Sequence, residues 1–382
     1  MDLFHIAPPL LTILVLWGVA CCIQIAYYLF LFFPILMVAR KQRRRTAPTE
    51  EQPPVSVIVY AHNKAKELET SLPMMLEQDY PLYEVVVVDN TSQDDTASVV
   101  AQYKALYPHL RSTEISSEVA FANATYFALS MGVKTAMYDQ VLFVDAAAVP
   151  FGLHWISSMQ RQFVPSADFV LGYSRLDLRP GRWNRWIRYD HVWRAGFCFA
   201  LALFVKPFSG FGNNIAYRKS MFFSHNGFMH LAHLPVGNEP LYLSDAASRR
   251  TTKVALLHDA HVRESAEFNF RSWLRRRKQV LYAYPHFSPS ARFLSGLEVF
   301  SRVVFLALSV YLLFHVDPLW IIAGVGARFF LQCCILIPLQ CLLDERKLWW
   351  SIPYYDMLVQ PVMLAFLFLV RCFSSSRRRV GC

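Results

Sequence analysis

The sequence predicts an α/β domain with a mostly parallel sheet, held to a membrane by apolar helices at both ends of the chain. Three observations predict it: long uncharged segments near both termini, short β-branched runs alternating with helical patterns in the middle, and basic residues beside the apolar segments. Overall, 54% of the residues are hydrophobic and 17% are charged, which is too apolar for a typical water-soluble protein. The central region alone is long enough to bury a core without disulfides or metals.

The first apolar segment, Leu10–Val38, contains 29 residues and no charge. A bilayer core needs about 20 such residues, so this segment can span a membrane with some tilt. Basic residues follow it, at positions 40 to 45, whereas residues 1–9 contain no lysine or arginine. Because basic residues favour the cytoplasmic side, we expect a cytoplasmic (inner) membrane with the central domain on its cytoplasmic face. This places a membrane helix at 10–38 and a basic linker at 39–54.

The C-terminal region predicts two or three more membrane helices within 291–372. The apolar runs Val303–Val316 and Leu319–Leu343 are separated by an Asp-Pro turn and are typical of a helical hairpin. The third run, Met357–Val370, is only 14 residues long and contains a proline. If it crossed the membrane, the basic residues Arg377–Arg379 would lie outside, against the positive-inside tendency, so we expect a re-entrant or interfacial helix.

Charge and cysteine content exclude several other classes. The net charge of +10 arises from basic residues that cluster beside apolar segments, and no RNA-binding aromatic signature accompanies them. We therefore expect a membrane partner and no nucleic acid. The eight cysteines form no CxxC pair, which excludes a zinc site or disulfide framework of that kind. Seven histidines of the central region suggest a metal site, but no pair has the HExxH arrangement: His62, His191, His225, His230, His233, His258 and His261. His230 and His233 are three residues apart, but no third ligand is evident for them.

Strands and helices alternate along the central domain, 55–290. Valine-rich runs without helical periodicity predict buried parallel strands, and runs with apolar residues three and four apart predict helices. Such alternation gives a right-handed, largely parallel sheet with helices on both faces. The predicted strands are Val55–Tyr60, Tyr83–Val88 and Val141–Val144, and the predicted helices are Lys64–Glu77, Asp95–Tyr107 and Phe121–Met137.

Ligands of such sheets bind beyond the carboxyl ends of the strands. The residues directly after the strands are therefore the candidates for a site: Ala61–Lys64, Asp89–Asp94 and Asp145–Pro150. Asp89 can accept a hydrogen bond from an N–H of a nucleotide base, with Asn63 and the backbone of Ala61 in the same crevice. The alternative is that Asp89 only caps the turn before Asp95.

Five segments in order resemble the inverting glycosyltransferases of family 2. They are Val55–Asn63, Gln78–Pro81, Glu84–Asp89 with Ser92, Asp94 and Thr96, Phe143–Pro150, and Gly210–Phe223 followed by Asn226-Gly-Phe228. The resemblance covers residues 50 to 285. It implies a GT-A fold and a nucleotide-diphosphate-sugar donor, and flanking membrane helices are common in that family. The implied acceptor is a lipid-linked glycan or a polysaccharide.

The resemblance also implies roles for single residues. Ala61, Asn63 and Asp89 would bind the nucleotide. Asp145 would bind Mg²⁺ or Mn²⁺, but the second metal carboxylate of the family is Ala147 in this chain. A single carboxylate holds such an ion weakly.

Two further positions depart from the family pattern. In the family's acidic cluster after Gly237, position 238 is asparagine, so Glu239 is the candidate catalytic base. The family's Gln-x-x-Arg-Trp motif is not kept, but Arg276, Arg277 and Lys278 could pair with a diphosphate. The alternative for this basic run is a solvated face against anionic lipid.

These observations support three hypotheses. The first is a membrane-bound glycosyltransferase that acts with inversion. The second is a catalytically inactive relative that serves as a structural or regulatory partner of another membrane glycosyltransferase, because three catalytic positions are altered. The third is a nucleotide-sugar sensor without turnover. The tryptophans at 183, 186 and 193 among arginines predict either an interfacial amphipathic helix or an acceptor groove.

Overall fold

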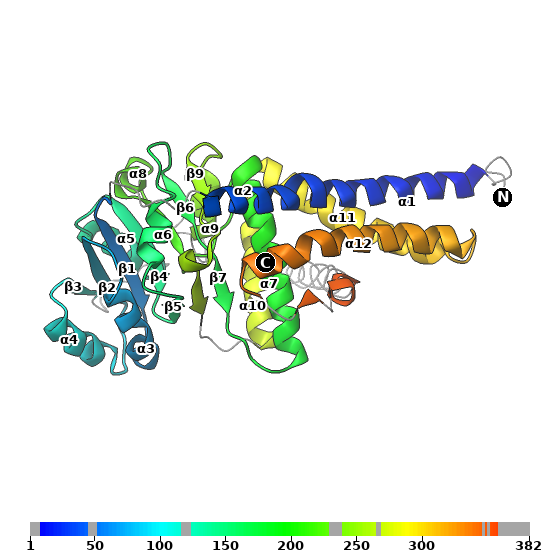
Figure 1. The fold of residues 1–382 in the computed structure, drawn as a ribbon. Helices are drawn as coiled ribbons and strands as arrows, with labels where there is room; N and C mark the ends of the chain where they lie inside the picture. Colours follow the sequence, from blue (N-terminus) through cyan, green and yellow to red (C-terminus); the bar gives the residue numbers. More distant parts are fainter. Residues whose placement is uncertain are drawn as a thin grey trace, which may run out of the picture.

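The computed structural model describes residues 8–44, 52–115, 124–228, 239–264, 269–345, 348–349 and 352–357. A domain built on β-sheet lies at one end of a bundle of long helices, and the first helix points away from the sheet toward its Pro8 end (Figure 1). The third apolar run, Met357–Val370, lies outside the described residues apart from Met357.

A seven-stranded sheet forms the centre of the domain, in the order β3-β2-β1-β4-β8-β6-β9. Strands β1 to β4 are parallel to one another, and β8 runs antiparallel to both β4 and β6. A second sheet has the order β5-β10-β7. The predicted α/β class with a mostly parallel sheet is confirmed. The strands are β1 Val55–Ala61, β2 Tyr83–Asp89, β3 Leu110–Glu114, β4 Gln140–Asp145, β5 Ala148–Pro150, β6 Phe169–Leu171, β7 Ser174–Leu176, β8 Ile215–Arg218, β9 Thr252–Val254 and β10 Val262–Glu264.

Helices connect these strands and cover the central sheet. The first three helices of the domain coincide with the predicted helical patterns to within a few residues. The helices of the domain are α3 Ala65–Leu76, α4 Thr96–Leu106, α5 Ala124–Thr135, α6 Trp155–Gln160, α7 Arg182–Phe204, α8 Lys219–Ser224, α9 Glu239–Ala246 and α10 Phe270–Ala283, with short 3₁₀ turns at His258–Ala260 and Tyr284–His286.

The valine-rich strands contribute to two separate cores. Along β1, Val57 and Val59 pack with one buried cluster, whereas Ile58 between them packs with the other. This alternation is the period of a strand whose two faces are both covered. The cluster that includes Ile58 continues to Ile35 of the first helix and Leu336 of the membrane hairpin. The sheet and the membrane helices therefore share one continuous apolar core.

Three helices in the described part of the chain are long and apolar enough to cross a membrane: Pro8–Arg44, Pro289–Leu312 and Pro318–Leu342. The first comprises α1 (Pro8–Ala26), a π-helical turn (Tyr27–Phe32) and α2 (Phe33–Arg44). The other two, α11 and α12, run side by side with it (Figure 1). The Asp-Pro turn begins α12, because the Asp317 carboxylate accepts a hydrogen bond from the Leu319 amide at 3.0 Å.

A buried polar cluster connects the membrane helices. Arg302 of α11 pairs with Glu298 and with Asp356, and Arg328 of α12 donates to the other oxygen of Asp356 at 2.9 Å. Arg328 also donates to the side chain of Gln24 in α1 at 3.0 Å. All of these side chains are buried. Because an unpaired charge at membrane depth is costly, these pairs determine how the helices fit together.

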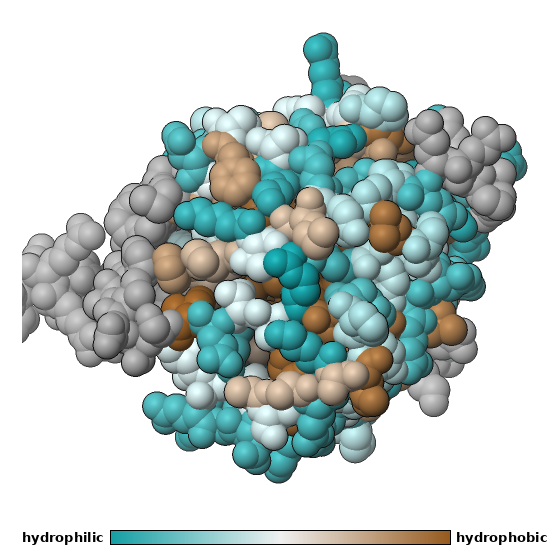
Figure 2. All heavy atoms as spheres, turned by 90° about the vertical axis from the view of Figure 1, so that its left-hand side faces the viewer, coloured by the Kyte–Doolittle hydropathy of each residue, from teal (hydrophilic) through white to brown (hydrophobic). Residues whose placement is uncertain are grey.

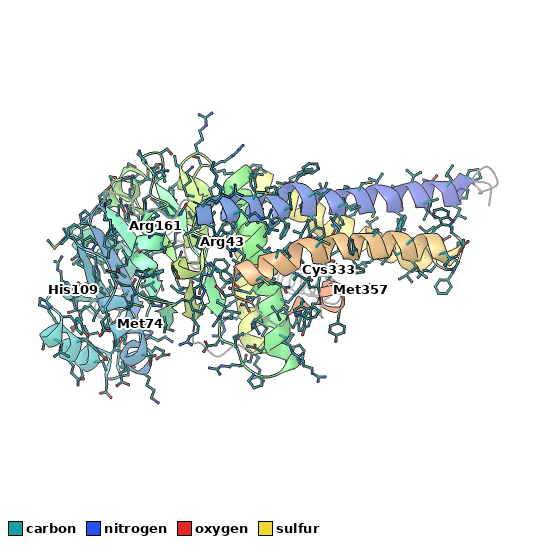
Figure 3. The ribbon with its side chains drawn as sticks, in the orientation of Figure 1. Arg43, Met74, His109, Arg161, Cys333 and Met357 are labelled. Atoms are coloured by element: carbon teal, nitrogen blue, oxygen red, sulfur yellow. The ribbon has the colours of Figure 1, made fainter. Side chains whose placement is uncertain are left out.

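Helices α7 and α10 lie between the sheets and the membrane helices and run across the direction of α1, α11 and α12 (Figure 1). Figure 3 shows Arg43 at the domain end of the first helix, whereas Cys333 lies on the membrane hairpin. The face of the domain that is turned away from the membrane helices is mostly polar (Figure 2).

One close backbone approach generates a stability prediction. A Cβ at Gly172, between β6 and β7, would lie 2.4 to 2.7 Å from the side chain of Asn214. Asn214 is buried and donates to the carbonyls of Tyr173 and Ala260, both at 2.8 Å, so it cannot move without loss of hydrogen bonds. We expect Gly172→Ala to destabilise the protein by about 1–3 kcal/mol.

Thermal unfolding of the detergent-solubilised protein would measure this loss. Gly152→Ala is the matched control, because a Cβ there meets no atom within 4 Å. Equal unfolding midpoints for the two variants would contradict the role given to Gly172.

Candidate functional site

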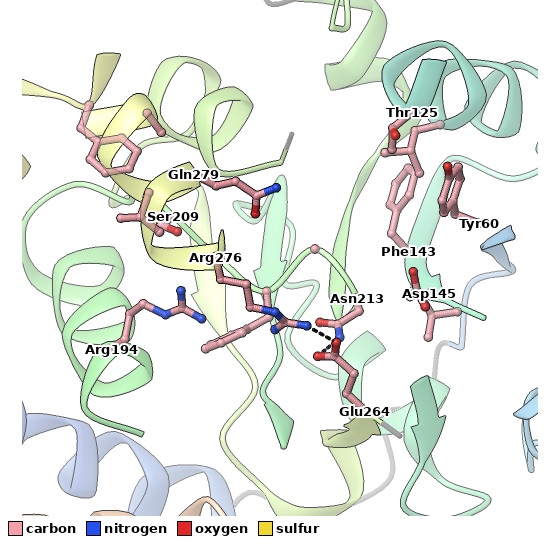
Figure 4. A pocket seen from close by; sticks show the side chains of 18 residues that line it. Tyr60, Thr125, Phe143, Asp145, Arg194, Ser209, Asn213, Glu264, Arg276 and Gln279 are labelled. Atoms are coloured by element: carbon pink, nitrogen blue, oxygen red, sulfur yellow. Dashed lines mark hydrogen bonds and ion pairs between the residues drawn. The ribbon is translucent and has the colours of Figure 1, made fainter. Parts of the chain in front are cut away.

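A cavity of about 450 Å³ opens where the carboxyl ends of β1 and β4 face α10 (Figure 4). Its walls come from segments far apart in the chain: strand ends, the loop before β8, the end of β10, and the helices α7 and α10. The polar side chains that line it are Tyr60, Thr125, Asp145, Arg194, Ser209, Asn213, Glu264, Arg276 and Gln279. The position is the one expected for a ligand site in a parallel sheet.

Asp145, predicted as the metal-binding residue, lies at the end of β4 and lines this cavity. Its Oδ1 accepts a hydrogen bond from the amide of Ala147 at 2.8 Å. Burial raises the pKa of Asp145 to about 6, with the nearby Glu264 adding to the rise, while the Ala147 amide, Lys64 and Arg276 oppose it. Ala147 itself is buried and contributes no ligand oxygen.

Glu264 is the second carboxylate of the cavity. It ends β10, pairs with Arg276, and accepts a hydrogen bond from the side chain of Asn213 at 3.0 Å. Sequence reasoning did not select Glu264, because it lies in a three-residue strand with no recognisable motif.

The three basic residues predicted to pair with the diphosphate, Arg276, Arg277 and Lys278, lie on different faces of α10. Arg276 lines the cavity together with Gln279, Val280 and Ala283, which are three, four and seven residues later on α10. Arg277 faces α7 instead, where it pairs with the buried Asp190. Lys278 is exposed and does not line the cavity. Only one of the three cations predicted for the diphosphate thus reaches the cavity, and Arg194 of α7, which was not predicted, joins it there.

The three residues predicted to bind the nucleotide meet at the ends of β1 and β2, beside the cavity. Ala61 pairs with Asp89 in the β1–β2 ladder. The Asn63 side chain accepts from the Gln93 amide at 2.8 Å, and Asp89 accepts from the Ser92 amide at 3.1 Å. Asp89 therefore accepts a hydrogen bond within its own turn.

None of these three residues lines the cavity that contains Asp145. Asn90 connects this region to the cavity. Its side chain donates a hydrogen bond to the Tyr60 hydroxyl at 3.1 Å, and Tyr60 lines the cavity.

Glu239, the predicted base, is the first residue of α9. Its side chain and residues 229–238 lie outside the described part of the structure, so the position of this carboxylate is not defined.

An aromatic cluster lies at the start of α7, apart from the cavity. Trp183 and Trp186 pack against Phe270 and Trp273 of α10, with ring centroids 5.1 to 6.1 Å apart. Trp183 is 46% exposed and Phe270 is 38% exposed. None of these four aromatic side chains lines the cavity. Helices α7 and α10 run across the direction of the membrane helices. The arrangement therefore favours an interfacial helix over an acceptor groove.

Comparison with known proteins agrees with this geometry. Residues 56–224 match the sequence model of the family described as Glycosyl transferase family 2. A segment of 104 residues is 34% identical to glycosyltransferase AglE of Haloferax volcanii and covers 27% of this chain and 33% of that protein. A segment of 136 residues is 26% identical to chondroitin synthase of Pasteurella multocida, with 35% and 13% covered. The chain thus spans a third or less of these relatives.

A solved structure extends the likeness to nearly the whole chain. The mannosyltransferase PcManGT of Pyrobaculum calidifontis, determined in complex with GDP-Man and Mn²⁺, is similar with a TM-score of 0.54 at 19% identity. The match covers 90% of this chain and 99% of that one. At this identity the likeness shows the fold, which is the GT-A fold that the sequence predicted.

The raised pKa of Asp145 generates a prediction about pH. Because the folded state favours the protonated acid, it is relatively most stable below the unfolded pKa of about 4, and this advantage is lost as pH rises to about 6. Asp145→Asn should therefore raise the thermal unfolding midpoint at pH 7.5 and leave it unchanged near pH 4. The gain is at most about 3 kcal/mol, and less because the side chain keeps some solvent contact.

The exposed Glu114 of β3 provides the control, since Glu114→Gln should change neither midpoint. If Asp145→Asn shifted the unfolding midpoint equally at both pH values, the cost of burying an ionised Asp145 carboxylate would be refuted.

Proposed function

We propose that this chain, whose residues 56–224 match the sequence model of glycosyl transferase family 2, is a membrane-bound inverting glycosyltransferase. It would transfer a sugar from a nucleotide-diphosphate donor to a lipid-linked or polysaccharide acceptor. The observation that carries the proposal is the cavity at the carboxyl edge of the sheet, where Asp145 and Glu264 lie with Arg276 and Arg194. PcManGT, which shares the fold, was solved with a nucleotide sugar.

The donor would bind with its base near Ala61, Asn63 and Asp89 and its diphosphate toward Arg276. In the structure Arg276 pairs with Glu264. A diphosphate would compete for this guanidinium, since phosphate oxygens pair with arginine in the same two-pronged geometry as carboxylates. The cation then takes up the charge that develops on the leaving diphosphate, which is the stabilisation that such a transfer needs most.

Mg²⁺ or Mn²⁺ fits the cavity better than the sequence suggested. Asp145 alone is a weak ligand, but Glu264 brings a second carboxylate close enough to raise the pKa of Asp145. Two carboxylates and the donor phosphates form an oxygen set of the kind these ions prefer. Bound there, the ion would neutralise charge on the diphosphate.

The acceptor hydroxyl needs a base on the face opposite the leaving group. The family resemblance assigns this role to Glu239, which would take the hydroxyl proton as the oxygen attacks the sugar. Glu264 serves the diphosphate side, because it holds Arg276 and Asn213. The two glutamates thus have separate roles that substitution can distinguish.

The three apolar helices support a membrane location, and we assign it to the cytoplasmic membrane. The basic end of the first helix, Lys41 to Arg44, lies beside the domain rather than at the far end of the bundle. By the positive-inside tendency the domain then faces the cytoplasm, where nucleotide sugars are made.

The altered positions favour one rival. Ala147 is packed into the core, and Lys64, where the family often has an acid, pairs with Glu67 at 2.9 Å. A chain that lost catalysis would serve as a structural or regulatory partner of another membrane glycosyltransferase.

Nucleotide binding provides the first test. The detergent-solubilised protein, titrated with UDP and GDP in Mg²⁺ or Mn²⁺, should bind at least one of them at or below millimolar concentration. Arg276→Gln should weaken this binding about 10-fold or more, because a charge-assisted hydrogen bond contributes about 1.5–3 kcal/mol. Lys278→Gln is the matched control and should bind like the wild type. If no nucleoside diphosphate binds, with or without divalent ions, the transferase proposal fails.

Turnover provides the second test. Glu239→Gln should lower the rate of nucleoside diphosphate release from the donor about 10²–10⁴-fold without weakening donor binding. Glu264→Gln should weaken the dependence of diphosphate binding on divalent ions, because it removes one of the two carboxylates proposed to hold the ion. Wild-type protein that binds the donor without turnover would identify a sensor. Absence of binding together with co-purification of an active membrane glycosyltransferase would identify the structural partner.

A further inference from the structure

Three metal-ligating side chains meet at a second place in the domain, outside the donor cavity. The Nδ1 atoms of His258 and His261 lie 2.8 and 2.9 Å from the same oxygen, Oδ2 of Asp344. All three possible ligand atoms lie within 4.8 Å of one another. None of these residues lines the cavity that contains Asp145.

The three side chains come from two separate parts of the fold. His258 begins a 3₁₀ turn and His261 directly follows it, so the turn presents both rings on one side. Asp344 lies two residues beyond the domain end of α12. It has a left-handed backbone, with φ of +59°. Aspartate is one of the few non-glycine residues that adopt this conformation readily, so the chain can turn here while it keeps a carboxylate at this position.

The types of ligand suit a transition-metal ion. Imidazole nitrogens and a carboxylate oxygen are among the ligands that Zn²⁺ takes in proteins. The His261 side chain is fully buried and that of Asp344 is 16% exposed, so the fold holds both in place.

The spacing and surroundings also suit a small ion. Ligands bound to Zn²⁺ at about 2.1 Å lie about 3.0–3.4 Å apart, so the present contacts need to open only slightly. Phe151 stacks on the His258 ring at 5.0 Å, and Arg175 donates to the backbone carbonyl of Asp344, which leaves the carboxylate to the histidines. His258 is 59% exposed, which gives an ion a path of entry and leaves room for water as a fourth ligand.

We propose that His258, His261 and Asp344 bind one Zn²⁺-type ion that joins the end of the membrane hairpin to the glycosyltransferase domain. Two imidazoles and one carboxylate select zinc-like ions over Mg²⁺, which prefers oxygen ligands. The next residue, Glu345, pairs with the buried Arg188 of α7, so the ion completes a two-point attachment. His261 directly precedes β10, which carries Glu264 to the donor cavity. The ion therefore fixes both the hairpin and one wall of that cavity.

The test uses Zn²⁺ alone, without nucleotide, so its result is independent of the transferase proposal. Chelator-treated full-length protein in detergent is titrated with Zn²⁺ against a chromophoric competitor, and bound metal is then counted by elemental analysis. We expect about one ion per chain and a higher thermal unfolding midpoint in its presence. His258→Gln and Asp344→Asn should each weaken binding by at least about 100-fold and abolish the Zn²⁺-dependent rise in midpoint.

Two controls separate this site from others. His154→Gln removes an exposed histidine that also lies beside a carboxylate, Asp79, but forms no metal-ligating group with a second histidine among the described residues. Asp145→Asn removes the carboxylate of the donor cavity. Both should bind Zn²⁺ like the wild type. Because His258 is exposed, its variant should fold even if the Asp344 variant does not. Failure of the wild type to bind micromolar Zn²⁺, or undiminished binding by His258→Gln, would overturn the proposal.

Discussion

The side-chain amide of Asn214 holds together the parts of the domain on which the cavity depends. Both of its N–H groups are used, for the carbonyls of Tyr173 and Ala260, and its oxygen accepts from the indole of Trp155 at 3.2 Å. An unpaired polar group at this fully buried position would cost about 1–3 kcal/mol for each lost partner. The amide thereby sets the relative positions of β8, the chain before β7 and the 3₁₀ turn. The preceding residue, Asn213, donates a hydrogen bond to Glu264 and so helps to position this carboxylate in the cavity.

The sequence predicted the parallel half of the sheet because most of its strands are apolar along their whole length. Strands β1, β2 and β4 are buried on both faces and consist mostly of valine and other apolar residues, so their pattern has one interpretation. Strand β3 was missed, since four of its five residues are only partly buried or exposed and its composition resembles a loop. The three-residue strands of the second sheet have no period to detect. Their existence depends on partners that are distant in the chain.

The candidate site was likewise predicted only in part. Asp145, Asn63 and Asp89 were predicted because each follows a strand whose end the sequence reveals. The basic run was identified as a unit, but the helical rotation of 100° per residue sends Arg276 to the cavity and Arg277 to Asp190. Glu264 and Arg194 could not be found, since only the folded chain brings them together. His258 and His261 were named only among seven histidines, and their partner Asp344 could not be identified because it lies more than eighty residues away.

The polar cluster within the membrane helices has a consequence for biogenesis. Arg328 would make α12 a poor candidate for insertion by itself, and its partners come from Gln24 near the start of the chain and Asp356 near the end. The translocon must therefore release these segments into lipid in a way that lets them find one another. The N-terminal helix is a specific partner in that assembly, and a generic hydrophobic anchor of equal length would not replace it.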